Sequence, residues 1–154
     1  MAKKDYALEW YRYGLQNDED YIFRFMMHWI AFNWLYSECD RNSEIANINA
    51  YCEMNYEKLK RYNPFNTEAF KEFRKGPIRG RSGGRSPEDL FDDICNKHGE
   101  RRVKSMLLTV YRVRCNLFHG TKRIDIERDQ ELIKSSAIIM EGYLRALLLD
   151  DPEF

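Results

Sequence analysis

The sequence carries no excess of either charge. Its 154 residues include 25 Lys and Arg and 25 Asp and Glu, so the formal net charge is zero. A protein that binds duplex DNA through an overall positive charge is therefore excluded, and any contact with nucleic acid must use a local patch. With 44% hydrophobic and 32% charged residues, the composition also excludes a disordered or collagen-like chain.

Long hydrophobic runs and paired cysteines are also missing. The apolar stretch Phe25–Leu35 is too short to cross a membrane, and it contains His28 and Asn33. The first residues lack the apolar run of a signal peptide. The four cysteines form no Cys-x-x-Cys pair and have no His at zinc-ligand spacing, so we expect them to be reduced. These features predict a cytoplasmic protein with no membrane contact, bound metal or cofactor.

Strand patterns are absent too, because nearly the whole chain shows the hydrophobic period of α-helices. Residues 21–39 are apolar on almost every face, which predicts a central helix surrounded by others. The sequence Ser86-Pro87-Glu88-Asp89 has the capping and charge pattern of a helix start. We expect one all-α domain over residues 1–154, an up-and-down bundle of about five to six helices. We expect helices at residues 6–14, 21–39, 44–61, 87–98, 100–119 and 126–149, and a short amphipathic segment at residues 67–75.

Glycine is concentrated in one stretch, residues 76–86. Gly76–Arg85 contains four glycines and one proline, which excludes a regular helix or strand. We expect a flexible loop that carries Arg79, Arg81 and Arg85. Residues 71–128 contain 15 Lys and Arg against 8 Asp and Glu, so this half of the chain has a net charge of +7. The loop is interpreted either as a cover that closes over bound RNA or as a solvated connector.

The segment Val103–Gly120 departs from a simple amphipathic pattern. Arg114 occupies one position of an otherwise aliphatic stripe, and charged side chains are almost never buried without a partner. Three interpretations are open: the guanidinium binds an internal carboxylate, extends to solvent, or serves an anionic ligand. Arg114 and His119 lie about 140° apart on an ideal helix, so one ligand contacts both only if the helix ends near Phe118 or a second chain contributes. A second stripe of this segment is polar: Ser105, Thr109, Arg112, Asn116 and His119.

The run Arg114-Cys115-Asn116-Leu117-Phe118-His119-Gly120 resembles the signature of the HEPN superfamily, in which an Arg is followed after four to six residues by a His. Residues 29–36 resemble the central helix of the same group. The resemblance implies a four- to five-helix bundle, a homodimer with facing motifs, and metal-independent RNA cleavage in toxin–antitoxin or antiviral defence. Cys115 departs from the pattern, since a polar residue is common there, and Arg112 also satisfies the spacing.

These residue types suit RNA cleavage by attack of the 2′-OH on the adjacent phosphorus. A histidine titrates near neutral pH and serves as acid or base, and the arginine fork matches phosphate oxygens. The products would be a 2′,3′-cyclic phosphate and a 5′-OH, and DNA would be inert.

The alternative is a non-catalytic module that binds a nucleotide, RNA or a partner protein. We expect single-stranded RNA as substrate and an antitoxin or another protein as a possible partner. The candidate catalytic residues are Arg114, Asn116 and His119, and the candidate substrate-binding residues are Arg112, Lys122, Arg79, Arg81 and Arg85.

Overall fold

We describe a computed structural model of the chain, which covers residues 2–17, 19–80, 83–118 and 127–154. These residues form seven α-helices and three 3-10 helices and contain no strand. The all-α prediction is therefore confirmed. In chain order the elements are α1 (Lys3–Leu15), α2 (Tyr21–Tyr36), η1 (Ser37–Cys39), α3 (Glu44–Met54), α4 (Tyr56–Leu59), η2 (Pro64–Asn66), η3 (Glu68–Lys75), α5 (Pro87–Asn96), α6 (Gly99–Phe118) and α7 (Glu127–Leu148).

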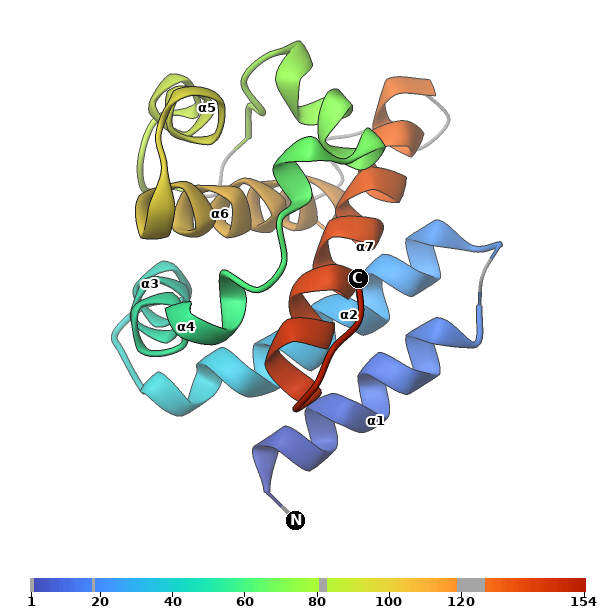
Figure 1. Ribbon diagram of the computed structural model, residues 1–154. Coiled ribbons are helices and arrows are strands. Elements are labelled where there is room, and N and C mark those ends of the chain that lie inside the picture. Colours follow the sequence, from blue (N-terminus) through green and yellow to red (C-terminus); the bar gives the residue numbers. More distant parts are fainter. Residues whose placement is uncertain (1, 18, 81–82, 119–126) are drawn as a thin grey trace.

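The helix α2 lies at the centre of the bundle, as its apolar sequence predicts. It begins at Asp20, whose carboxylate accepts a hydrogen bond from the backbone N–H of Phe23 at 3.0 Å, a normal N-cap. It contacts α1, α3 and α7, and Figure 1 shows α1 and α2 side by side with α7 crossing them. Phe25, Trp29 and Phe32 are buried in the core. Burial on several faces explains why this helix has no polar side.

The helix α6 is held between α5, α3 and α7. Its buried side includes Met106, Leu107 and Val110. The residues from 76 to 86 that the structure describes connect η3 to α5 without regular structure. At the end of this connection Ser86 caps α5, accepting a hydrogen bond from the N–H of Asp89 at 3.1 Å. The packing therefore places the Gly- and Arg-rich segment against the motif helix.

Two expected segments differ from the structure in detail. The segment expected at 44–61 is interrupted at Asn55, whose side chain donates to the carbonyl of Tyr51 at 3.0 Å. Such local bonding competes with regular helix formation. The segment expected at 67–75 is the 3-10 helix η3. Its buried Phe70 and Phe73 are three residues apart, which matches three residues per turn.

Two further properties concern the described part of the chain. None of its helices has both the length and the hydropathy that a membrane crossing requires. Nor does it hold three or more His, Cys, Asp or Glu side chains grouped so that they would bind a metal ion. The four cysteines are free thiols.

Candidate functional site

The HEPN-like motif occupies the last turns of α6. The structure describes Arg112, Arg114 and Asn116, and α6 ends at Phe118, whose side chain is exposed. The remaining motif residue, His119, lies outside the described residues, and so do Lys122 and Arg81 of the predicted binding set. The site is therefore built from the helix that leads to His119 and from the loop beside that helix.

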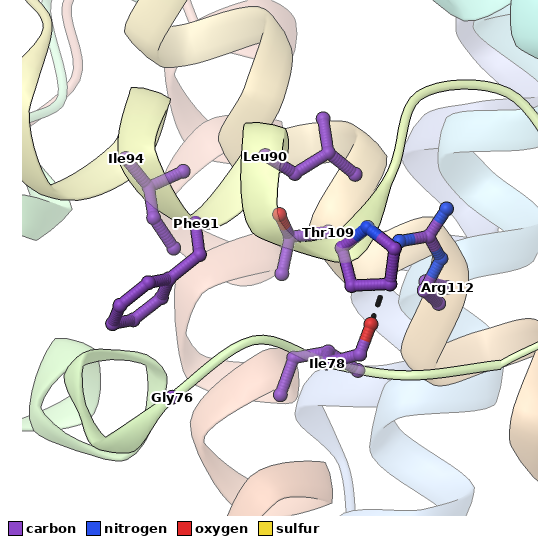
Figure 2. Close-up of a pocket in the computed structure, with 8 residues that line it drawn as sticks. Gly76, Ile78, Leu90, Phe91, Ile94, Thr109 and Arg112 are labelled. Carbon is purple, nitrogen blue, oxygen red and sulfur yellow. Dashed lines mark hydrogen bonds between the residues drawn. The ribbon is translucent and has the colours of Figure 1, made fainter.

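Arg112 is a buried arginine that binds the loop through backbone carbonyls. Its guanidinium donates to the carbonyls of Arg85 at 2.8 Å, Gly83 at 3.1 Å and Ile78 at 3.4 Å. Figure 2 shows the bond to Ile78 beside the cavity that Arg112, Thr109 and Leu90 line. Burial lowers the pKa of Arg112 from its usual value. The geometry gives Arg112 a structural task, because its fork is directed at the protein's own backbone.

Asn116 repeats this arrangement one turn further along α6. Its side chain is buried, and Nδ2 donates to the carbonyl of Arg79 at 2.6 Å. Gly80 lies so close that a Cβ built there would stand 2.0 Å from Oδ1 of Asn116. A side chain at position 80 would therefore push the loop away from α6. Together, Arg112 and Asn116 attach both described ends of the loop to the motif helix.

Arg85 ends the loop in a buried ion-pair cluster. It binds the carboxylate of Asp93, which is fully buried and also accepts from Ser105 Oγ at 2.6 Å and Arg101 Nε at 3.0 Å. Burial raises the pKa of Asp93, but the hydrogen bonds from Arg85, Ser105 and Arg101 together lower it below the usual 3.8. Asp93 therefore stays ionised and anchors the end of the loop.

Arg79 is more exposed than Arg85, with 69% of its side chain accessible against 39%. Its Nη2 is 2.6 Å from Oε1 of Glu88, and both side chains are largely exposed. Exposed ion pairs of this kind contribute only about 0–1 kcal/mol to stability. Of the two described loop arginines, Arg79 is the one available to a ligand.

Arg114 lies on another side of α6 and is bound only loosely. Its Nη1 is 3.7 Å from Oε2 of Glu44, too far for a strong hydrogen bond. Its Cζ lies 4.7 Å from the centre of the Phe118 ring. Its Nε is buried and has no hydrogen-bond partner in the structure. Nε of the guanidinium is thus an unused donor. The side chain as a whole is 27% exposed.

Glu44 is held in place by two tyrosines rather than by Arg114. The hydroxyl of Tyr36 donates to Oε1, and the hydroxyl of Tyr111 donates to Oε2 at 3.2 Å. Burial and the hydrogen bond to Glu44 raise the pKa of Tyr36 well above its usual value, so this hydroxyl remains a donor. Because the tyrosines keep Glu44 in place, Arg114 can leave it without a large rearrangement.

The sequence alone does not reveal the partners of Glu44 and Asp93. Glu44 is recognisable only as part of a helix start, and nothing local links it to α6. Asp93 has a detectable signal, because it lies beside Leu90 and Ile94 on the buried side of α5. An acid on the apolar side of a helix requires a buried partner. That signal predicts an ion pair but does not name Arg85.

Three described cavities beside α6 are small, and the one between Ile78, Thr109 and Arg112 measures about 10 Å³ (Figure 2). A second of about 80 Å³ lies between Tyr111, Arg112 and the loop glycines 83 and 84. Another of about 10 Å³ adjoins Asn116 and Asp129. Sites that enclose a small molecule usually measure about 300–1,000 Å³. These described cavities are therefore too small to enclose such a ligand, whereas Arg114 is partly exposed and Arg79 largely exposed at the surface. Comparisons with protein-family models, curated proteins and solved structures find no match for this chain.

Proposed function

We propose that the protein is a metal-independent RNA endonuclease that cuts single-stranded RNA through attack of the 2′-OH. The observation that carries this proposal is the state of Arg114. This residue lies one turn before the end of α6 and has a buried, unpartnered Nε–H and only one loose ion pair. Buried polar groups in proteins nearly always have a partner, and Nε of Arg114 is one of six buried side-chain atoms of the described residues that lack one. A phosphodiester supplies the acceptor oxygens that this group lacks.

In this proposal Arg114 stabilises charge on the phosphoryl oxygens, and His119 transfers the proton. In the resting protein Glu44 takes the place of the phosphate. The Arg114–Glu44 pair is 27% and 31% exposed at its two side chains, and such partly solvated pairs contribute about 1 kcal/mol or less. An RNA phosphate therefore draws Arg114 away from Glu44 at little cost, while the tyrosines keep Glu44 in place.

The proposal gives Arg112 and Asn116 a supporting role. Both bind loop carbonyls and are almost fully buried, so they hold the loop beside the motif rather than contact substrate. Their bonds bring Arg79 next to α6, where its exposed guanidinium adds to the local positive charge. We further propose a cytoplasmic homodimer, because two copies of His119 would supply one base and one acid. A role in toxin–antitoxin or antiviral defence follows from the resemblance of the motif.

The decisive measurement is cleavage of a labelled single-stranded RNA in the presence of EDTA. We expect products with 2′,3′-cyclic phosphate ends and no cleavage of an oligomer with 2′-deoxyribose at every position. His119→Ala should reduce the rate by about 10²–10⁴-fold. His98→Ala is the matched control, because His98 is exposed in the turn before α6 and outside the motif. Unchanged cleavage by His119→Ala would refute the assignment.

A second candidate is a non-catalytic module that binds RNA, a nucleotide or a partner protein. It is favoured by the engagement of Arg112, Asn116 and Arg85 in internal bonds, which leaves few polar groups for catalysis. The same assay separates the two candidates. RNA that binds but remains intact for hours, with wild-type and His119→Ala alike, supports the second.

A further inference from the structure

A cavity of about 550 Å³ opens beside α7, well apart from the residues of the proposed RNA site. Its wall consists of residues from the start of α2, the linker that joins α4 to η3, α7 and Phe154. Figure 1 locates the helices α2, α4 and α7. Its size falls in the range of about 300–1,000 Å³ typical of small-molecule sites. Neither the motif nor the Gly- and Arg-rich loop contributes to its wall. The cavity therefore requires its own explanation.

The charged side chains of the wall are three arginines and one glutamate: Arg24, Arg61, Arg145 and Glu141. The carboxylate of Glu141 is already bound. Its Oε2 accepts from Arg24 Nε at 2.9 Å and lies 3.4 Å from Nε2 of the buried His28. Burial raises the pKa of Glu141, but the bonds from His28 and Arg24 lower it below its usual value. Glu141 is thus an anion with engaged oxygens, and the wall keeps a formal charge of +2.

The donors of the wall outnumber its acceptors. Arg145 donates to the carbonyl of Glu153 at 3.3 Å and to Oε1 of Glu141 at 3.5 Å, and its side chain is 32% exposed, which leaves part of its donor fork open to a ligand. The amide oxygen of Asn63 accepts a hydrogen bond from the N–H of Phe65. The NH₂ group of Asn63 takes no part in that bond. Arg61 binds the carbonyls of Leu149 and other residues at the end of α7, so it supplies charge rather than free donors. A ligand that complements this wall is rich in acceptors and negatively charged.

One side of the cavity is formed by two aromatic rings. The rings of Tyr62 and Phe154 lie 5.2 Å apart and are inclined by 33°. The Tyr62 ring is pressed against Gly142 of α7, where a Cβ would come within 2.1 Å of it. The Cζ of Arg145 is 6.0 Å from the centre of the Phe154 ring. Apolar ring surface and guanidinium are therefore adjacent, an arrangement that suits a ligand with a ring at one end and an anion at the other.

We propose that this cavity binds a small aromatic phosphate, with the ring on Tyr62 and Phe154 and the phosphate on Arg145. Phosphate is favoured over carboxylate because a dianion offers more acceptor oxygens to a donor-rich wall of net positive charge. The proposal does not depend on RNA cleavage, since it uses none of the residues assigned to that reaction.

The test is an NMR titration of the full chain with phenyl phosphate, inorganic phosphate, benzyl alcohol and benzoate. We expect saturable shifts of the Tyr62 and Arg145 signals with phenyl phosphate, and weaker binding of the other three probes. Arg145→Gln should weaken phenyl phosphate by about tenfold, the loss expected for one charge-assisted hydrogen bond. Arg12→Gln is the matched control, because Arg12 is an exposed arginine of α1 outside the cavity.

A second variant tests the aromatic half without removing a charge. Gly142→Ala must displace the Tyr62 ring, so it should weaken phenyl phosphate while leaving inorganic phosphate unchanged. Equal affinity for phenyl phosphate and inorganic phosphate would overturn the aromatic half of the proposal. Binding of benzoate as tight as phenyl phosphate would overturn the choice of phosphate. The absence of saturable binding, or equal affinity in wild type and Arg145→Gln, would overturn the site itself.

Discussion

Two arginines of α6 that are two positions apart have opposite surroundings. Arg112 is almost fully buried and donates to three backbone carbonyls. Arg114 is partly exposed, has one ion pair at 3.7 Å and keeps a buried Nε–H without a partner. By position in the sequence, Arg114 belongs to the apolar stripe and Arg112 to the polar one. The structure places them the other way round, with Arg112 covered and Arg114 at the edge.

The difference separates a structural arginine from a candidate ligand-binding one. A buried guanidinium is tolerated when its donors are satisfied, and the loop carbonyls satisfy those of Arg112. Removing Arg112 should therefore affect stability first. Removing Arg114 should affect ligand binding first, because its internal contacts are weak.

The largest effect on folding is expected for Arg112→Leu. This change leaves the carbonyls of Ile78, Gly83 and Arg85 without their donor, and unsatisfied buried groups cost about 1–3 kcal/mol each. Partial access of water to the loop reduces the total, so we expect a loss of about 3 kcal/mol in the free energy of unfolding. Urea unfolding followed by circular dichroism measures it. Arg112→Lys should lose less free energy of unfolding, since lysine keeps the positive charge but lacks the planar guanidinium with its several donors. A loss under about 0.5 kcal/mol in Arg112→Leu would show that the loop is not held in this way.

Asp93→Asn should have the next largest effect, and the effect should depend on pH. The folded pKa of Asp93 lies below the value in the unfolded chain, because hydrogen bonds from Arg85, Ser105 and Arg101 outweigh burial. Its contribution is therefore complete above the unfolded value near 3.8 and is lost as the pH falls through the folded pKa. We expect a loss of about 2 kcal/mol at pH 7, discounted because Arg85 and Arg101 are partly exposed.

The pH dependence provides the check on Asp93. Unfolding of wild type and Asp93→Asn is compared at several values between pH 7 and pH 3. The difference between the two proteins should be constant down to about pH 4 and then shrink. A difference that stays the same at every pH would indicate that the carboxylate contributes no charge to the cluster. Asp92→Asn is the neighbouring control, since Asp92 is exposed.

The sequence predicts the local parts of this fold well. Asp20 and Ser86 are normal N-cap residues, and both cap the helices that follow them. The hydrophobic period predicts α2, α6 and α7 because each buries a long apolar face. The interruption at Asn55 is missed, since it depends on one side chain bonding to the preceding turn. Propensity is too weak to predict such a choice.

The surroundings of the motif are not predictable from local patterns. The position of Arg114 among aliphatic residues suggests a buried charge, whereas the structure places Arg114 partly exposed with one buried donor, Nε, lacking a partner. The identity of its partner depends on where α3 packs, because Glu44 comes from a distant part of the chain. For the same reason, helical spacing groups Arg112 with Asn116 but does not reveal that both bind the loop.

Arg114→Gln should have the smallest effect on folding and the clearest effect on RNA. The lost ion pair with Glu44 is partly solvated, so we expect a change below about 1 kcal/mol in the free energy of unfolding. If Arg114 stabilises the phosphoryl oxygens, cleavage should fall by about 10²–10³-fold, the size seen when one such donor is removed. Unfolding and RNA cleavage are measured on the same preparations of Arg114→Gln and Arg112→Lys. A large loss of stability in Arg114→Gln with no loss of cleavage would reverse the two roles. In that case Arg114 would be a structural residue like Arg112, because its pair with Glu44 would then be the contact that holds α3 against α6.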